Sequence, residues 1–230
     1  MKTLHFFLDF DGTIATTDVV DMVLEKFADK KWRDVEREWQ SGKIGSRECL
    51  TRQVELLKAE PGQIAELVSG VSLDPYFVPF IQKAEELGVL VTIVSDGFDL
   101  FIEQTLKKNL GPSSGYLKAL PIFSNRLQPK PGGGFEVVFP SGPVCEHGCA
   151  NCKEALIKRL ISLDDQVLFV GDGLSDRYAA KIAHVTFAKA KLLDYCRDNS
   201  IDCIPYENFK KIKEWLTDNH AFLKKASFKQ

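Results

Sequence analysis

The sequence predicts an α/β protein, built as a Rossmann-like, doubly wound parallel sheet with an inserted small helical cap. Two observations predict the sheet: short apolar runs recur along the 230-residue chain, and amphipathic helical patterns lie between them. A third observation predicts the cap, because a long stretch of helical pattern follows the first apolar run without another strand signal.

The expected strands are Leu4–Phe10, Val89–Val94 and Val167–Val170, apolar runs that each end in a polar or glycine-containing turn. The expected helices carry apolar residues at three- and four-residue spacing and are Tyr76–Leu87, Leu100–Leu110, Glu154–Leu163 and Asp176–Ala183. Strands that alternate with helices in this way indicate a doubly wound sheet. Active-site residues of such sheets lie at the carboxyl ends of the strands.

Residues 16–74 are expected to form the cap, and residues 1–15 and 75–230 the core domain. The helical patterns of the cap are Val19–Phe27, Trp32–Trp39 and Glu48–Leu57. We expect Trp32 and Trp39 to pack inside the cap, because they lie on one helical pattern. An insert at this place would lie over the strand ends and admit only small substrates.

A second interruption of the alternation falls at about residues 116–140. Two β-leaning runs, Leu117–Phe123 and Phe135–Phe139, flank the turn-rich segment QPKPGGG. This pattern predicts a β-hairpin that leaves the core sheet.

The composition is that of a globular protein without an electrostatic preference for polyanions. Hydrophobic residues make up 44% of the chain and charged residues 27%, and the formal charge is −2. These values argue against disorder, nucleic-acid binding and membrane binding. We expect no signal peptide and no membrane span, which would need about 20 apolar residues. The protein is therefore expected to be cytoplasmic, with formation of a homodimer left open.

The first expected strand ends in the segment LDFDGTI, where Asp9 and Asp11 lie on the same side of an extended chain and Gly12 and Thr13 turn it. Two carboxylates so close together repel each other unless a cation lies between them, and Mg²⁺ is the usual partner. One carboxylate could then attack phosphorus while the other handles protons. Taken alone, such a pair is more often an acidic turn at a strand end, because short motif matches are common.

Polar residues follow the other two strands as well. Ser95, Asp96 and Gly97 come at the end of the second strand and offer a hydroxyl and backbone N–H groups to a phosphate. Lys153 opens a helix and can supply a positive charge to a phosphate oxygen. After the third strand, Asp172 and Asp176 lie one helical turn apart, where both can face a cation.

These motifs, in this order, resemble those of the haloacid dehalogenase superfamily. The resemblance implies a Mg²⁺-dependent phosphatase that acts on a small phosphomonoester through a phosphoaspartate. The residue roles it implies are Asp9 as nucleophile, Asp11 as general acid and base, Ser95, Asp96, Gly97 and Lys153 as phosphate binders, Asp9, Asp11 and Asp172 as metal site, and Thr13 and Asp176 as supporting residues. A catalytically degenerate binding module and a phosphotransferase are the alternatives.

Within the superfamily, the helical insert and the segment GDGLSD are similar to the phosphoserine phosphatase branch. The run CEHGCANCK is similar to phosphatases of methionine salvage, which act on 2-hydroxy-3-keto-5-methylthiopentenyl-1-phosphate, and to phosphoethanolamine/phosphocholine phosphatases. The resemblance therefore implies a metabolite-sized substrate of one of these kinds.

The same run places Cys145, His147, Cys149 and Cys152 within eight residues. A zinc site of three cysteines and one histidine is one interpretation. We expect reduced, unligated thiols instead, because four ligands from one short loop strain tetrahedral geometry.

Overall fold

The computed structural model describes residues 3–111, 115, 120–140 and 145–223. Within them lies a seven-stranded sheet in the order β4-β3-β2-β1-β5-β6-β7. The strands are β1 (Leu4–Leu8), β2 (Leu90–Phe98), β3 (Ile122–Pro129), β4 (Phe135–Val138), β5 (Gln166–Gly171), β6 (Val185–Ala188) and β7 (Ile204–Pro205). All neighbours pair in parallel except β3 and β4. The predicted doubly wound α/β sheet is confirmed.

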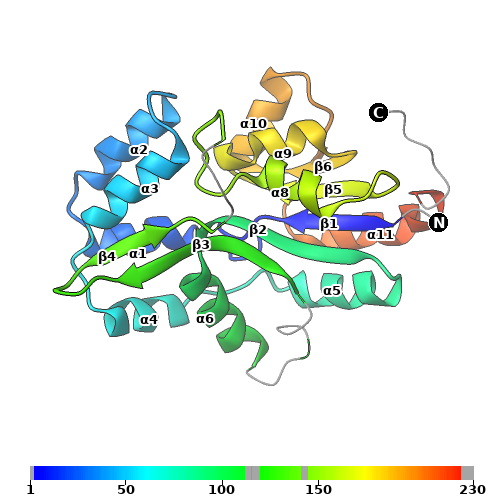
Figure 1. Ribbon diagram of the computed structural model, residues 1–230. Helices are drawn as coiled ribbons and strands as arrows, with labels where there is room; N and C mark the ends of the chain where they lie inside the picture. Colours follow the sequence, from blue (N-terminus) through cyan, green and yellow to red (C-terminus); the bar gives the residue numbers. More distant parts are fainter. Residues whose placement is uncertain (1–2, 112–114, 116–119, 141–144, 224–230) are drawn as a thin grey trace.

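Helices cover both faces of the sheet (Figure 1). They are α1 (Val19–Phe27), α2 (Trp32–Gln40), α3 (Ser46–Glu55), α4 (Pro61–Ser69), α5 (Phe77–Glu86), α6 (Asp99–Leu110), α8 (Lys153–Leu160), α9 (Arg177–Ile182), α10 (Ala190–Asp198) and α11 (Phe209–Leu223), with a short 3₁₀ turn η1 (Leu174–Asp176) before α9. Among the described residues, no helix has the length and apolar character needed to cross a bilayer.

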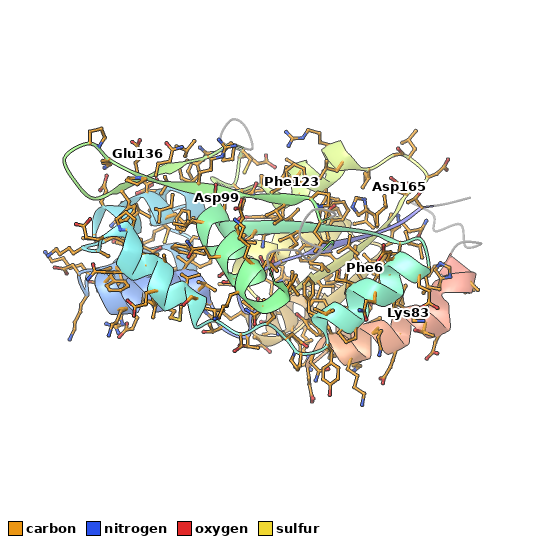
Figure 2. The ribbon with its side chains drawn as sticks, turned by 90° about the horizontal axis from the view of Figure 1, so that it is seen from below. Phe6, Lys83, Asp99, Phe123, Glu136 and Asp165 are labelled. Atoms are coloured by element: carbon orange, nitrogen blue, oxygen red, sulfur yellow. The ribbon has the colours of Figure 1, made fainter. Side chains whose placement is uncertain are left out.

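Strand β1 is buried on both faces, and its alternating side chains enter two separate cores. Phe6 packs with residues of α5 and α11 on one face, whereas Phe7 packs against α8 and α9 on the other. In the view from below, α5, α6 and α11 cover the face that contains Phe6 (Figure 2). The run of five apolar or aromatic positions in Leu4–Leu8 therefore reflects burial from two sides.

Four helices, α1 to α4, lie between β1 and α5, in the range predicted for the cap. Helix α2 packs on α3, α3 packs on β4, and α4 packs on α6. Helix α1 has the predicted bounds, and the Asp18 side chain caps it by accepting a hydrogen bond from the Asp21 backbone N–H. Trp32 is buried as expected.

The predicted hairpin consists of β3 and β4, which pair antiparallel. Strand β3 begins at Ile122, and its first residues pair in parallel with β2, so the hairpin continues the core sheet. Residues 116–119 of the predicted run lie outside the described residues. Four elements near the end of the chain, β6, α10, β7 and α11, were not predicted, nor was α4. Strands β6 and β7 have only four and two residues, too few for a periodic pattern.

The core makes a prediction about stability. Phe80 is fully buried and packs against Phe6 and Phe209, with ring centroids 5.1 and 5.2 Å apart. Phe80→Ala should therefore lower the free energy of unfolding by about 3–5 kcal/mol. Phe222→Ala, at a ring that is 65% exposed, is the matched control and should change it little. Equal effects in urea denaturation would contradict this packing.

Candidate active site

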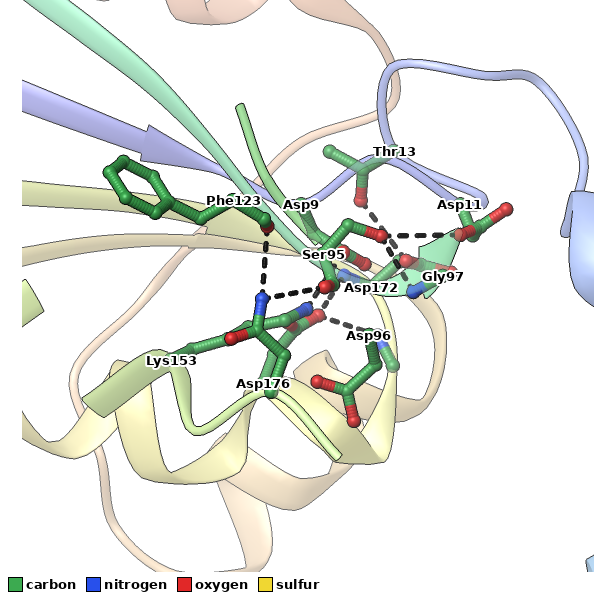
Figure 3. Close-up of polar contacts among 12 residues, drawn as sticks. Asp9, Asp11, Thr13, Ser95, Asp96, Gly97, Phe123, Lys153, Asp172 and Asp176 are labelled. Atoms are coloured by element: carbon green, nitrogen blue, oxygen red, sulfur yellow. Dashed lines mark hydrogen bonds and ion pairs between the residues drawn. The ribbon is translucent and has the colours of Figure 1, made fainter. Parts of the chain in front are cut away.

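Neighbouring strands bring the predicted residues together at one edge of the sheet, as Figure 3 shows. Asp9 directly follows β1, and its backbone N–H donates to Val170 of β5 at 2.9 Å. Asp172 directly follows β5, and Ser95 lies near the carboxyl end of β2. Because β1 lies between β2 and β5, the three motifs become neighbours. Lys153, the first residue of α8, completes the group.

Lys153 is a buried cation held between two carboxylates. Its Nζ lies 2.7 Å from Asp9 Oδ1 and 2.5 Å from Asp176 Oδ1, and its side chain is 1% exposed. Burial alone lowers the pKa of Lys153, but Asp176 and Asp9 outweigh this effect and raise it. Burial and Asp176 raise the pKa of Asp9 well above its ordinary value, and Lys153 opposes them. The lysine is therefore charged in the folded protein and fixes the position of Asp9.

Three carboxylates form a compact oxygen-rich group. One oxygen each of Asp9, Asp172 and Asp176 lies within 4.8 Å of the others. The Thr13 hydroxyl donates to Asp172 Oδ1 at 3.0 Å, and Asp176 Oδ2 accepts from the backbone N–H groups of Asp172 and Gly173, each at 3.0 Å. Thr13 and Asp176 thus orient the acidic group, and their predicted role as supporting residues stays a prediction. Burial and Asp176 raise the pKa of Asp172 to about 6.

Asp11 lies outside this group. Its Oδ1 accepts a hydrogen bond from the backbone N–H of Val19, at the start of α1, at 2.9 Å, and Ser95 Oγ donates to its Oδ2 at 3.4 Å. Burial and the nearby Asp18 raise the pKa of Asp11 to about 8. The structure therefore joins Asp11 to the first turn of α1, while its predicted part in the metal site stays a prediction.

The segment after Val94 places three predicted residues in different surroundings. Ser95 is fully buried, and its Oγ accepts a hydrogen bond from the Gly97 backbone N–H at 2.9 Å. A Cβ at Gly97 would overlap the Asp11 carboxylate, which explains a glycine at this close approach. Asp96 turns toward α3, where its Oδ2 accepts from Ser46 Oγ at 2.9 Å. The side chain of Asp96 thus contacts the helical insert, and burial raises its pKa.

Asn151 is a supporting residue that the sequence reasoning missed. It is buried, and its Nδ2 donates to the carbonyl oxygens of Ser95 and Phe123 at 2.8 and 2.9 Å. It therefore ties the segment before Lys153 to the carboxyl-terminal part of β2 and to the start of β3. An asparagine two residues before a lysine has no sequence signature for this role.

A cavity of about 280 Å³ opens beside Asp9, Asp11 and Asp172. Its opposite wall comes from the helical insert and carries three carboxylates, together with Trp39, Ser46 and Gln53. These acidic residues, Asp18, Asp21 and Glu36, were not singled out from the sequence, where they look like ordinary helix-surface residues. Trp39 was expected to pack inside the cap and instead lines the cavity.

The carboxylates of this wall lie close enough to influence one another. Burial, Asp18 and Glu36 raise the pKa of Asp21 and Lys191 opposes them, which together gives a pKa of about 7. Burial and Glu36 also raise the pKa of Asp18. Glu36 is held in place by Gln53, whose Nε2 donates to Glu36 Oε2 at 3.0 Å. The wall is therefore acidic and preformed.

A family model described as haloacid dehalogenase-like hydrolase matches residues 6–181. The chain belongs to this family. The resemblance inferred from its motifs is thereby confirmed. A relative from Bacillus mycoides, named 2-hydroxy-3-keto-5-methylthiopentenyl-1-phosphate phosphatase, is 27% identical over 212 residues, covering 91% of this chain and 94% of the relative. A protein of the same name from Exiguobacterium sp. is 26% identical over 216 residues, covering 92% and 96%.

Solved structures of phosphoserine phosphatases share the fold. A substrate-bound complex aligns with a TM-score of 0.70 at 23% identity, covering 94% of this chain and 98% of the other. A phosphoaspartyl intermediate analogue aligns with a TM-score of 0.71, also at 23% identity, covering 94% and 99%. At this identity the likeness concerns the fold, so the chemistry must be argued from this chain's own residues.

The buried ion group predicts a large and pH-dependent effect of one substitution. Lys153→Met leaves Asp9 and Asp176 without their cation and should destabilise the protein by about 3–5 kcal/mol at pH 7. The loss should shrink as the pH falls toward 5, because the folded carboxylates then take up protons that the unfolded chain does not yet bind. Urea denaturation at both pH values measures this.

Lys158→Met is the matched control for that experiment. Lys158 lies on the same helix, pairs with Glu154 at 2.6 Å and is exposed, so its removal should change stability little at either pH. If the two variants were equally stable, Lys153 would not hold the site together.

Proposed function

We propose that this enzyme hydrolyses a small phosphomonoester through a phosphoaspartate formed on Asp9. The observation that carries the proposal is the position of Asp9, which lies between the cavity and Lys153. Lys153 holds Asp9 Oδ1, and among the described residues the other oxygen accepts no hydrogen bond. That oxygen is free to attack phosphorus from the cavity.

The acidic group suits a divalent cation with oxygen ligands. Asp9, Asp172 and Asp176 bring three carboxylates together, whereas Lys153 forms ion pairs with Asp9 and Asp176, so negative charge is left uncompensated. Mg²⁺ prefers such ligands. Asp9 and Asp172 would hold the ion, with Asp11 as the further predicted ligand. When bound, Mg²⁺ neutralises part of the phosphate charge that repels an attacking carboxylate.

Asp11 handles the proton in both half-reactions. In the first, Asp9 bonds to phosphorus, the ester P–O bond breaks, and Asp11 protonates the leaving alkoxide. In the second, Asp11 takes a proton from the water that attacks the acyl phosphate, which releases inorganic phosphate and restores Asp9. A carboxyl group whose pKa is raised to about 8 can serve as an acid near neutral pH.

Ser95 and the backbone of Gly97 are proposed to bind the phosphate oxygens. Ser95 Oγ lies next to Asp11, and Gly97 lines the cavity together with Asp96. Lys153 contributes positive charge from beneath Asp9. The side chain of Asp96 contacts α3 through Ser46 and is an anion that would repel phosphate, so its backbone is the part proposed for phosphate binding.

The substrate that the relatives favour is 2-hydroxy-3-keto-5-methylthiopentenyl-1-phosphate, which appears in the names of both relatives described above. They match more than nine-tenths of this chain, so the proposal covers the insert as well as the core. A cavity of about 280 Å³ accommodates a metabolite of this size and excludes a folded phosphoprotein.

Asp9→Asn should abolish turnover while the protein stays folded, because an amide cannot form the covalent intermediate. Chelation of divalent ions should stop the wild-type reaction, and added Mg²⁺ should restore it. Phosphate release from a small phosphomonoester measures both effects, and circular dichroism checks the fold. Substantial turnover by folded Asp9→Asn protein would disprove the mechanism.

A second candidate substrate class is an amine-bearing phosphomonoester such as phosphoethanolamine, phosphocholine or phosphoserine. The acidic wall of Asp18, Asp21 and Glu36 favours it, because carboxylates and the neighbouring Trp39 are suited to bind an ammonium group. An uncharged thioether chain would form no ion pair with these carboxylates. The wall and the relatives' names therefore point to different substrates.

Glu36→Gln separates the two candidates. If the substrate carries an ammonium group, the variant should lower kcat/KM for phosphoethanolamine by about 10- to 100-fold, because a charged hydrogen bond is lost. Its kcat/KM for a phosphomonoester whose carbon skeleton carries no charge should not change. Glu25→Gln, on the surface of α1 where Glu25 pairs with Arg33, is the control. Equal effects on both substrates would leave the methionine-salvage candidate.

A further inference from the structure

Three cysteines of the loop before α8 converge on one point. The Sγ atoms of Cys145, Cys149 and Cys152 lie within 4.8 Å of one another, and each side chain is half-buried. All three thiols are free. Because their number is odd, a disulfide would leave one of them unpaired, so pairing does not explain the cluster.

The spacing of the sulfurs suits a thiophilic metal ion. Zinc–sulfur bonds of about 2.3 Å place the sulfurs of a tetrahedral site roughly 3.8 Å apart. The cysteine side chains need only small movements from their present positions to reach that spacing. Thiolate ligands select soft and borderline metal ions such as Zn²⁺ and Cu(I).

The backbone of the loop also donates a hydrogen bond to one of the sulfurs. Gly148 has a positive φ of 62°, and the next backbone N–H, that of Cys149, donates to Cys145 Sγ at 3.4 Å. Burial raises the pKa of Cys145, but the N–H groups of Cys149 and His147 outweigh it and lower the pKa. Cys152 occupies the N-cap position of α8 without a side-chain cap hydrogen bond, and burial raises the pKa of its thiol.

His147 does not belong to this cluster. Its ring stacks on Tyr178 with centroids 3.8 Å apart and an angle of 7° between the planes. The sequence disfavoured zinc because four ligands from one loop would be strained. In the structure the loop supplies three ligands instead of four. Because the sulfurs are half-buried, water could occupy the fourth position.

We propose that Cys145, Cys149 and Cys152 bind a thiophilic divalent cation, Zn²⁺ in the first place, at a site separate from the carboxylates around Asp9.

The bound ion would fix the loop that positions two parts of the active site. Lys153 follows Cys152 directly, so ordering the loop orders the buried cation. The same loop contacts α3, since the Arg47 backbone N–H donates to the Gly148 carbonyl at 3.0 Å and the Ala150 N–H donates to Ser46 Oγ at 2.8 Å. A metal here would therefore act as a positioning element between the helical insert and Lys153.

Cobalt binding tests the site directly. The full chain is stripped of metal under reducing conditions and titrated with Co²⁺ in excess Mg²⁺, which occupies carboxylate sites. One equivalent should produce a thiolate-to-cobalt charge-transfer band, and Zn²⁺ should remove the band by displacing cobalt. Zn²⁺ should also lower the number of reactive thiols in the wild-type protein by three. This readout needs no variant and does not depend on the proposed phosphatase activity.

The variant carrying Cys145→Ser, Cys149→Ser and Cys152→Ser should bind Zn²⁺ at least about 100-fold more weakly. Cys203→Ser, a half-buried cysteine outside the cluster, should bind Zn²⁺ like the wild type. Absence of the charge-transfer band, an unchanged number of reactive thiols, or equal zinc affinity in the triple variant would each overturn the proposal.

Discussion

The ion group formed by Lys153, Asp9 and Asp176 is the interaction on which the active site depends. It joins the end of β1, the start of α8 and the turn after β5, three places far apart in the sequence. A lysine that is 1% exposed is stable only while its partners remain charged and close. The position of Asp9 is thus set by the same contact that allows Lys153 to be buried, and the cavity opens on the other side of Asp9.

Polar contacts, in addition to a shared apolar core, connect the helical insert to the edge of the sheet that carries the candidate site. Ser46 accepts a hydrogen bond from the Ala150 N–H and donates one to Asp96, and the first N–H of α1 is bonded to Asp11. The insert therefore reaches the proposed acid–base residue at one end and the cysteine loop at the other. A substitution in the insert would therefore change the positions of side chains both at Asp11 and near Lys153.

The elements with strong periodic patterns could be predicted from the sequence. Helix α1 has the predicted bounds, and β1, β2 and β5 lie where buried apolar runs were found. The elements that were missed are short, like β7 with two residues, or depend on packing partners elsewhere in the chain, like α11, which packs on α5. Their apolar residues are too few or too scattered to form a periodic pattern that distinguishes a helix or a strand from a loop.

For the candidate site, the sequence by itself determined the motif residues, because they lie in short segments, most of them at strand ends: Asp9 and Asp11, Ser95, Lys153, and Asp172 with Asp176. Only the tertiary structure decided which of these carboxylates meet, and it separated Asp11 from the group of three. It also decided the acidic cavity wall and the convergence of three thiols without His147. These features join side chains from different helices or depend on the path of a loop, and neither is encoded by residue spacing along the chain.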